Sequence, residues 1–188
     1  MTLDLPDSAR VLVDVDGTLC ANLPRLVEYV DAEHGVGITT DEVTEWSYPV
    51  DGTGKHVGQL IDDAMAHRRE WFLLGMDPIP GADEAMRSLS EAGHDLHIAT
   101  HRPSETHEVT EQWLAEHDIP YDAYEYDVPA NKGCLDGDLL VDDYHRNVGD
   151  TLAEGKAGAL FRQPYSDPAA CEGALVVDSW ADLVAAVR

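Results

Sequence analysis

VLVDVDGT, residues 11–18, is the stretch on which the interpretation of the whole sequence depends. Residues 11–15 form a short β-branched run followed directly by turn residues, which predicts a buried strand. Strand alternation directs Asp14 and Asp16 to the same side, and Gly17 allows a sharp turn behind them. Two carboxylates this close repel each other unless a cation or a proton lies between them. The stretch therefore predicts an acidic pair at the carboxyl end of a buried strand.

Two kinds of cation site use such an acidic pair. A calcium loop of the EF-hand type needs Gly at its sixth position and Glu at its twelfth. Here Gly17 is fourth in the motif, which excludes that loop. The alternative is a magnesium site in which one carboxylate attacks as a nucleophile and the other transfers a proton. An Asp-x-Asp pair is also compatible with an exposed strand end, so residues elsewhere must decide.

Further polar residues lie at or near the carboxyl ends of later predicted strands. They are Thr100, His101, Arg102, Lys132, Asp142 and Asp143. The Thr100 hydroxyl and the amides after it can hold a phosphate oxygen, and His101 and Arg102 add cationic contacts. Lys132 can neutralise phosphate charge. Because a parallel sheet gathers the carboxyl ends of its strands at one edge, we expect all of these residues to meet there.

Strand and helix patterns alternate along most of the chain. Strands are predicted at residues 11–15, 95–100, 123–126, 139–141, 157–161 and 174–177. Helices are predicted at residues 82–92, 104–117, 144–154 and 180–187. This alternation favours an α/β fold with three layers, in which helices cover both faces of a parallel, Rossmann-like sheet.

Residues 20–77 interrupt the alternation. They contain three helical patterns, at residues 23–34, 40–46 and 55–74, and no convincing strand. We therefore expect a small helical cap at residues 20–79, inserted after the first strand, and a catalytic core made of residues 1–19 and 80–188. A cap at this point in the chain would lie over the carboxyl ends of the strands, where ligands bind in open α/β sheets.

Composition adds one unusual feature, a formal net charge of −25 from 37 acidic and 12 basic residues among 188. Such a surface repels nucleic acid polymers and anionic membranes. It also repels itself unless salt screens it, so we hypothesise a halophilic, cytoplasmic protein that needs molar salt. No apolar run is long enough to span a membrane, and the N-terminus lacks the pattern of a signal peptide. The scattered Cys20, Cys134 and Cys171 predict reduced thiols.

The order Asp-x-Asp, Thr, Lys, Asp-Asp resembles that of the haloacid dehalogenase-like phosphatases. Within them the chain most resembles the 5'(3')-deoxyribonucleotidase type. The likeness extends to WFLLGMDPIPGADEA (71–85), DLLVDD (138–143) and SWADL (179–183), and so covers nearly the whole chain. Receiver domains also use Asp, Thr and Lys with Mg²⁺, but their acidic pair comes first and their phosphoacceptor Asp lies before the Thr. The order in this chain does not match theirs.

The resemblance implies a role for each acidic residue. Asp14 is expected to attack phosphorus, and Asp16 to protonate the leaving alkoxide and then activate water against the aspartyl-phosphate. Asp14, the backbone carbonyl of Asp16, and Asp142 are expected to hold Mg²⁺, with Asp143 assisting. These roles agree with the preference of a hard cation for oxygen ligands.

The remaining candidates concern the phosphate and the substrate. The resemblance implies that Thr100 and Lys132 bind the phosphoryl oxygens, and Thr18 is a further candidate for phosphate binding. Family members usually carry Ser after the Thr, whereas this chain has His101 and Arg102, which alters the phosphate pocket. The aromatic residues of the predicted cap either stack a nucleobase or pack in its core. They are Trp46, Tyr48, Trp71 and Phe72.

The expected reaction is hydrolysis of a phosphomonoester, with a nucleoside 5'-monophosphate or a deoxynucleotide as the expected substrate. The alternatives are a phosphatase for another small metabolite, such as a sugar phosphate, and a phosphate-binding regulatory module without catalysis. Covalent phosphate trapped by acid would favour the enzyme over the module.

Overall fold

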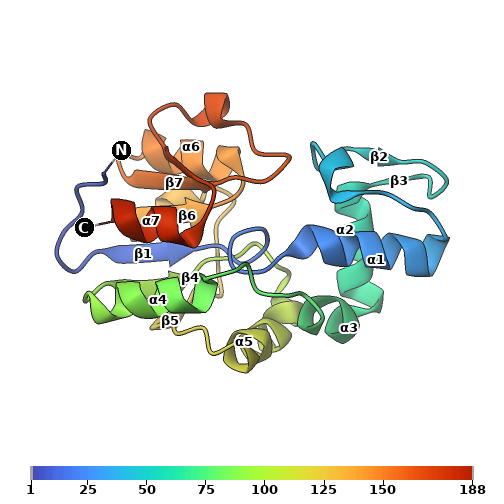
Figure 1. The fold of residues 1–188 in the computed structure, drawn as a ribbon, viewed down its shortest axis with the longest axis horizontal. Coiled ribbons are helices and arrows are strands. Elements are labelled where there is room, and N and C mark those ends of the chain that lie inside the picture. Colours follow the sequence, from blue (N-terminus) through green and yellow to red (C-terminus); the bar gives the residue numbers. More distant parts are fainter. Residues whose placement is uncertain (1, 188) are drawn as a thin grey trace.

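Six parallel strands form one sheet in the order β5-β4-β1-β6-β7-β8 in the computed structural model (Figure 1). Their bounds are β1 (Arg10–Val13), β4 (Asp95–Ile98), β5 (Ala123–Tyr124), β6 (Leu139–Asp142), β7 (Ala157–Phe161) and β8 (Leu175–Val177). The structure describes residues 2–187, so Met1 and Arg188, the outer ends of the predicted core, lie outside the described residues. The predicted parallel α/β sheet is confirmed.

The central strand β1 carries the first motif of the sequence. It pairs with β4 on one side and β6 on the other, so that Val13 lies opposite both Ile98 and Val141. Its apolar residues are almost fully buried, as expected of a parallel strand that is covered on both faces. The Asp14 amide then donates to the Val141 carbonyl at 2.9 Å, which holds the first acidic residue at the end of the strand.

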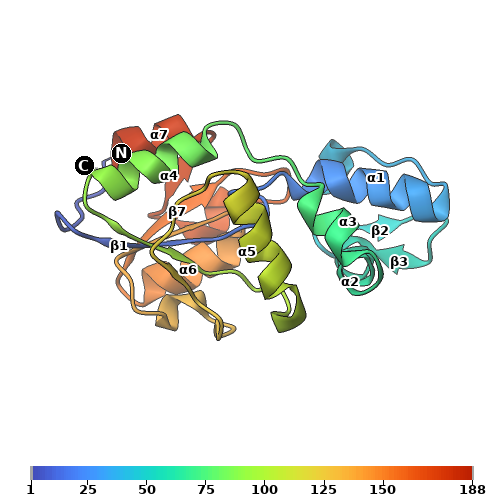
Figure 2. The same ribbon diagram turned by 90° about the horizontal axis from the view of Figure 1, so that it is seen from below.

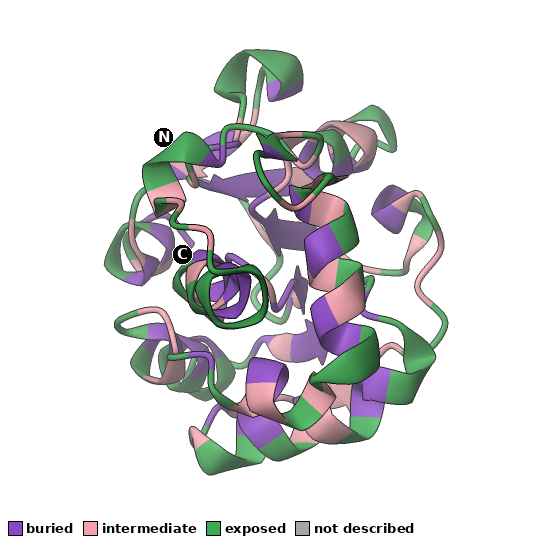
Figure 3. Cartoon of the chain, turned by 90° about the vertical axis from the view of Figure 1, so that its right-hand side faces the viewer, coloured by how far each residue is buried: buried purple, intermediate pink, exposed green. Residues whose placement is uncertain are grey.

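Helices cover both faces of the sheet, as Figure 2 shows. Helices α4 (Ala82–Glu91) and α7 (Trp180–Ala186) lie on one face, and α5 (His107–Glu116) and α6 (His145–Ala153) on the other. Their sides that face the sheet are buried and include Val148 of α6, Trp113 of α5 and Trp180 of α7, each no more than 1% exposed. Figure 3 shows buried strands at the centre and exposed residues on the outer faces of the helices. The arrangement is the expected three-layer fold.

The segment between β1 and α4 lies beyond the sheet edge toward which β1 points (Figure 1). It contains α1 (Asn22–His34), the 3₁₀ turn η1 (Thr40–Glu42), β2 (Pro49–Val50), β3 (Lys55–His56), α2 (Val57–His67) and α3 (Arg69–Leu74). None of the helices in residues 2–187 combines the length with the hydrophobicity that a membrane-spanning helix requires.

The expectation that this segment has no strands was wrong. Strands β2 and β3 pair as a short antiparallel hairpin. Gly52 and Gly54 lie in its turn with φ of 85° and 71°, in the left-handed region that glycine adopts without strain. Strands of two residues are too short to show the alternation on which sequence-based prediction relies, so their turn was the only available signal.

Two of the predicted helices in the segment are also corrected. The pattern at residues 40–46 forms only the η1 turn, closed by hydrogen bonds between Thr39 and Glu42. The pattern at residues 55–74 begins as strand β3 and divides into α2 and α3 at Arg68, whose φ of −134° is not helical. Local hydrogen bonding and tertiary packing outweigh the weak helix preference of these residues.

Candidate active site

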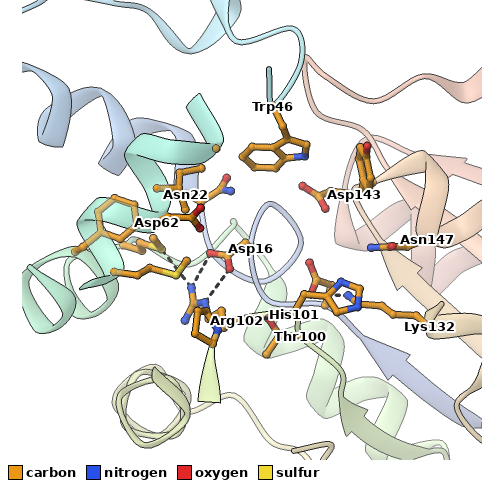
Figure 4. A pocket seen from close by; sticks show the side chains of 18 of the residues that line it. Asp16, Asn22, Trp46, Asp62, Thr100, His101, Arg102, Lys132, Asp143 and Asn147 are labelled. Carbon is orange, nitrogen blue, oxygen red and sulfur yellow. Dashed lines mark hydrogen bonds and ion pairs between the residues drawn. The ribbon is translucent and has the colours of Figure 1, made fainter. Parts of the chain in front are cut away.

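The carboxyl ends of β1, β4 and β6 bring the predicted residues together, as the sheet topology requires. Asp14 follows β1, Thr100 lies two residues after β4, and Asp142 is the last residue of β6. A cavity of about 360 Å³ opens at this edge, between the core and the segment that carries α1 to α3 (Figure 4). Its lining includes most of the predicted site residues, namely Asp14, Asp16, Thr100, His101, Arg102, Lys132 and Asp143.

Lys132 is a buried cation between two carboxylates. Its Nζ lies 2.8 Å from Asp14 Oδ1 and 2.7 Å from Asp142 Oδ2, and the side chain is 1% exposed. Burial alone lowers the pKa of Lys132, but the charges of Asp14 and Asp142 outweigh burial and raise it above its usual value. Lys132 therefore stays charged and places its positive charge directly beside the Asp14 carboxylate.

Asp14, Asp142 and Asp143 form an acidic cluster. Each offers a carboxylate oxygen, and these oxygens lie within 4.8 Å of one another. Burial raises the pKa of Asp14 to about 7; Lys132 opposes the shift, and the charges of Asp142 and Asp16 add to it. Burial, followed by the charges of Asp142 and Asp14, raises the pKa of Asp143 well above its usual value. One lysine does not balance three buried carboxylates, and this oxygen donor set fits a hard divalent cation such as Mg²⁺.

Asn147 orients the Asp142 carboxylate within this cluster. Its Nδ2 donates to both carboxylate oxygens, at 3.1 and 3.0 Å, and the Tyr144 amide donates to Oδ1 at 2.8 Å. Asn147 lies in the first turn of α6, five residues after Asp142. Sequence reasoning missed it, although its short spacing from the Asp-Asp pair was a usable signal.

Asp16 points to Arg102. The guanidinium donates from Nε to Asp16 Oδ2 at 2.8 Å and from Nη2 to Oδ1 at 2.7 Å (Figure 4). Its Nη1 donates to Thr110 Oγ1 at 3.1 Å, so each guanidinium nitrogen has a protein partner. Burial raises the pKa of Asp16, but the charge and hydrogen bonds of Arg102 outweigh it and lower the pKa below its usual value. The structure thus places Arg102, a candidate phosphate ligand, in a bidentate pair with Asp16.

The other candidate phosphate-binding residues differ in position. The Thr100 side chain lines the cavity, and its Oγ1 accepts a hydrogen bond from the Arg102 amide at 3.2 Å. His101 is exposed at the cavity, where its Nε2 donates to the Pro129 carbonyl at 2.9 Å. Thr18 is fully buried, and its Oγ1 has no hydrogen-bond partner within residues 2–187. The structure therefore brings Thr100 and His101 to the cavity and places Thr18 in the interior.

The segment between β1 and α4 supplies the other wall of the cavity. Its apolar lining residues are Trp46, Ile61, Met65, Phe72 and Met76, and its polar ones are Asn22, His56 and Asp62. Of the four aromatic candidates, Trp46 and Phe72 line the cavity. Trp71 instead packs against the guanidinium of Arg25, at 3.5 Å from the ring centre.

Tyr165 is a further residue that sequence reasoning missed. It lies in the loop after β7, is 4% exposed, and forms a hydrogen bond through its hydroxyl with Asp143 Oδ2. It is 22 residues away from Asp143 along the chain, in a segment without regular structure. No motif or periodicity marks such a position.

The fold and this site define a haloacid dehalogenase-like phosphatase. A family model described as "5' nucleotidase, deoxy (Pyrimidine), cytosolic type C protein" matches residues 8–188. The chain therefore belongs to this 5'-nucleotidase family, as the sequence resemblance predicted.

Solved structures support the fold. A hydrolase of the same superfamily from Deinococcus radiodurans R1, with bound phosphate and sodium, is 21% identical, with a TM-score of 0.65 and coverage of 96% of this chain and 94% of that one. A predicted phosphatase from Clostridium acetobutylicum is 15% identical, with a TM-score of 0.68 and coverage of 97% and 98%. A mutant of CbbY from Rhodobacter sphaeroides, in complex with xylulose-(1,5)bisphosphate, is 18% identical, with a TM-score of 0.59 and coverage of 94% and 96%. A comparison with curated proteins found no match.

Proposed function

We propose that this chain is a magnesium-dependent phosphomonoesterase that acts through an aspartyl-phosphate on Asp14. Its proposed substrates are nucleoside 5'-monophosphates, including deoxynucleotides. The observation that carries the proposal is the position of Asp14, which directly follows the central strand and lies beside the buried Lys132 and two further carboxylates. A carboxylate in this position faces the cavity, with positive charge ready to neutralise a phosphoryl group.

In the proposed first step, a carboxylate oxygen of Asp14 attacks phosphorus and the bond from phosphorus to the ester oxygen breaks. The leaving alkoxide takes a proton from Asp16. In the second step, Asp16 removes a proton from a water molecule that attacks the phosphorus, which releases phosphate and restores Asp14. Thr100 and Lys132 bind the phosphoryl oxygens in both steps.

Magnesium would be held by Asp14, Asp142 and the backbone carbonyl of Asp16, with Asp143 assisting, and would neutralise charge on the phosphoryl group. The pair formed by Asp16 and Arg102 favours the ionised form of Asp16, which the second step requires. The first step requires Asp16 to carry a proton and to turn from Arg102 toward the ester oxygen. Arg102 therefore acts in this proposal by orienting Asp16.

Substrate choice is assigned to the proposed cap, residues 20–79, and the chemistry to the proposed core, residues 1–19 and 80–188. The apolar side chains of Trp46, Ile61 and Phe72 on the cap wall suit the flat face of a nucleobase. Family membership supports the same substrate class.

A panel of phosphate esters tests the proposal. We expect phosphate release with Mg²⁺ and none with EDTA, and a higher kcat/KM for nucleoside 5'-monophosphates than for 3'-monophosphates, sugar phosphates or p-nitrophenyl phosphate. Acid quenching during turnover should trap covalent phosphate on the protein. Preferred turnover of a sugar phosphate would overturn the nucleotidase assignment, and phosphate binding without turnover would make the chain a regulatory module.

We further propose a cytoplasmic location in a high-salt cell, on the ground of the formal net charge of −25. Several basic side chains already have acidic partners, such as Arg10 with Asp95 and Lys55 with Asp63. The excess acids therefore lack cations of the protein to pair with. Because added salt shortens the Debye length from about 10 Å at 0.1 M to about 3 Å at 1 M, it should weaken their repulsion.

The expected result is a melting temperature that rises steadily as KCl increases from about 0.1 M to about 1 M, the range over which screening becomes short-ranged. Differential scanning calorimetry measures it, and a sucrose series of equal osmolality is the control, because sucrose does not screen charge. A melting temperature that is independent of KCl would contradict the halophilic assignment.

A further inference from the structure

Tyr165 connects the cap wall of the cavity to the acidic cluster. Its hydroxyl forms a hydrogen bond with Asp143 Oδ2, and its ring packs on Trp46 with 4.7 Å between ring centroids and 41° between planes. Trp46 and Asp143 lie on the same side of the cavity in Figure 4. Tyr165 thus contacts both Trp46 on the cap wall of the cavity and Asp143 in the acidic cluster.

The loop that carries Tyr165 is fixed to the site at two further points. Gln163 Nε2 donates to the Gly17 carbonyl at 2.7 Å, and Ser166 Oγ donates to the Asp143 carbonyl at 2.7 Å. The position of Tyr165 is therefore defined by the same backbone that carries the acidic residues.

The space around the Tyr165 hydroxyl is also closed. Gly17 has a φ of 71°, and a Cβ placed there would clash with the Asp143 carboxylate and the Tyr165 hydroxyl. The tyrosine and the carboxylate are therefore packed directly against the first motif. The hydroxyl contacts Asp143 Oδ2 and so holds this carboxylate in one orientation. Hydrogen bonds of this kind fix the orientation of metal ligands.

Trp46 also forms a backbone hydrogen bond with helix α2, which lines the cavity. Its carbonyl accepts a hydrogen bond from the Gly58 amide at 2.9 Å, in the first turn of α2. His56, just before that helix, and Gly58, Ile61 and Asp62 in its first half line the cavity together with Trp46. When Trp46 packs on Tyr165, this end of α2 is held over the cavity.

We propose that Tyr165 is a positioning residue with two contacts that depend on each other. Its hydroxyl orients Asp143 for the cation, and its ring is the surface of the core on which Trp46 docks the cap. Binding of the cation and docking of the cap should therefore strengthen each other. The inference rests on the proposed function, because it requires the acidic cluster to bind Mg²⁺.

The substitution Tyr165→Phe removes the hydroxyl and keeps the ring. We expect the Kd for Mg²⁺, measured by isothermal titration calorimetry on the full chain, to rise about 10-fold. The Mg²⁺ concentration for half-maximal activity should rise in parallel, while kcat at saturating Mg²⁺ stays within a few-fold of the wild type. A loss of kcat that excess Mg²⁺ does not restore would contradict a positioning role.

Tyr126→Phe is the matched control, because Tyr126 is 56% exposed and its hydroxyl donates to Glu111. Its Kd for Mg²⁺ should equal that of the wild type. The substitution Trp46→Leu tests the other contact, and it should raise KM and weaken Mg²⁺ binding a few-fold. In a protein that already carries Tyr165→Phe, the substitution Trp46→Leu should weaken Mg²⁺ binding less than it does in the wild type, because the two contacts are coupled.

The outcomes separate this inference from the proposed function. If the wild type binds Mg²⁺ and Tyr165→Phe binds it equally well, only the role of the hydroxyl is overturned. If Trp46→Leu leaves both KM and Mg²⁺ affinity unchanged, the coupling to the cap is overturned. If the wild type does not bind Mg²⁺, the proposed function is overturned and this inference with it.

Discussion

Asp14→Asn should abolish phosphate release, lowering kcat by on the order of 10⁴-fold or more, as expected for loss of a nucleophile. The amide has nearly the size of the carboxylate but cannot form the phosphoryl-enzyme bond. Phosphate release with Mg²⁺ measures the loss, and acid quenching should trap no covalent phosphate. Asp7→Asn, an exposed change of the same chemistry, is the control and should keep full activity. Turnover retained by Asp14→Asn would remove Asp14 as the nucleophile.

The same variant should remain folded, because it removes a buried charge that the metal-free protein disfavours. The pKa of Asp14 is raised from 3.8 to about 7, so the fold prefers the protonated carboxyl. Protonation of Asp14 stabilises the fold fully at a pH below 3.8, the pKa of this carboxyl in the unfolded chain. This stabilisation is lost as the pH rises through the pKa of about 7 in the folded protein. Asn does not titrate. In EDTA, the melting temperature of the wild type should therefore fall relative to that of Asp14→Asn as the pH rises from 3.8 to about 7.

Lys132→Met should cause the largest combined loss of activity and stability. The side chain of Met is similar in length but uncharged, so Asp14 and Asp142 would lose the cation that lies within 2.8 Å of both. Removing one partner of a buried ion pair typically costs about 3–5 kcal/mol. Urea unfolding in EDTA measures the free energy of unfolding. We expect kcat/KM to fall about 10³-fold, as for loss of one group that stabilises charge in the transition state.

Two further variants test whether the loss of stability in Lys132→Met comes from the buried carboxylates beside Lys132. Lys55→Met removes a partly exposed ion pair with Asp63 and should cost no more than about 1 kcal/mol. Lys132→Met in the Asp14→Asn background should be less destabilising than in the wild type, because one of the two carboxylates is already neutral. If Lys132→Met alone keeps the stability and the activity of the wild type, Lys132 neither stabilises the fold nor takes part in the reaction.

Much of the sheet and of the site was predictable from the order of residues along the chain. Strand β1 is apolar and β-branched because both its faces are buried, and Asp14 follows it directly. In a parallel sheet every strand ends at the same edge, so Asp14, Thr100 and Asp142 had to converge. The hairpin of β2 and β3 was not predictable in this way, because strands of two residues carry no period.

The sequence by itself thus determined the parallel sheet, the family, and the convergence of Asp14, Lys132 and Asp142, because backbone topology is encoded in local patterns. Only the tertiary structure decided how individual side chains are used. It paired Asp16 with Arg102 across 86 residues, buried Thr18, and brought Tyr165 to Asp143. Such choices depend on burial and on hydrogen-bond partners that are distant along the chain, and these exist only once the core has packed.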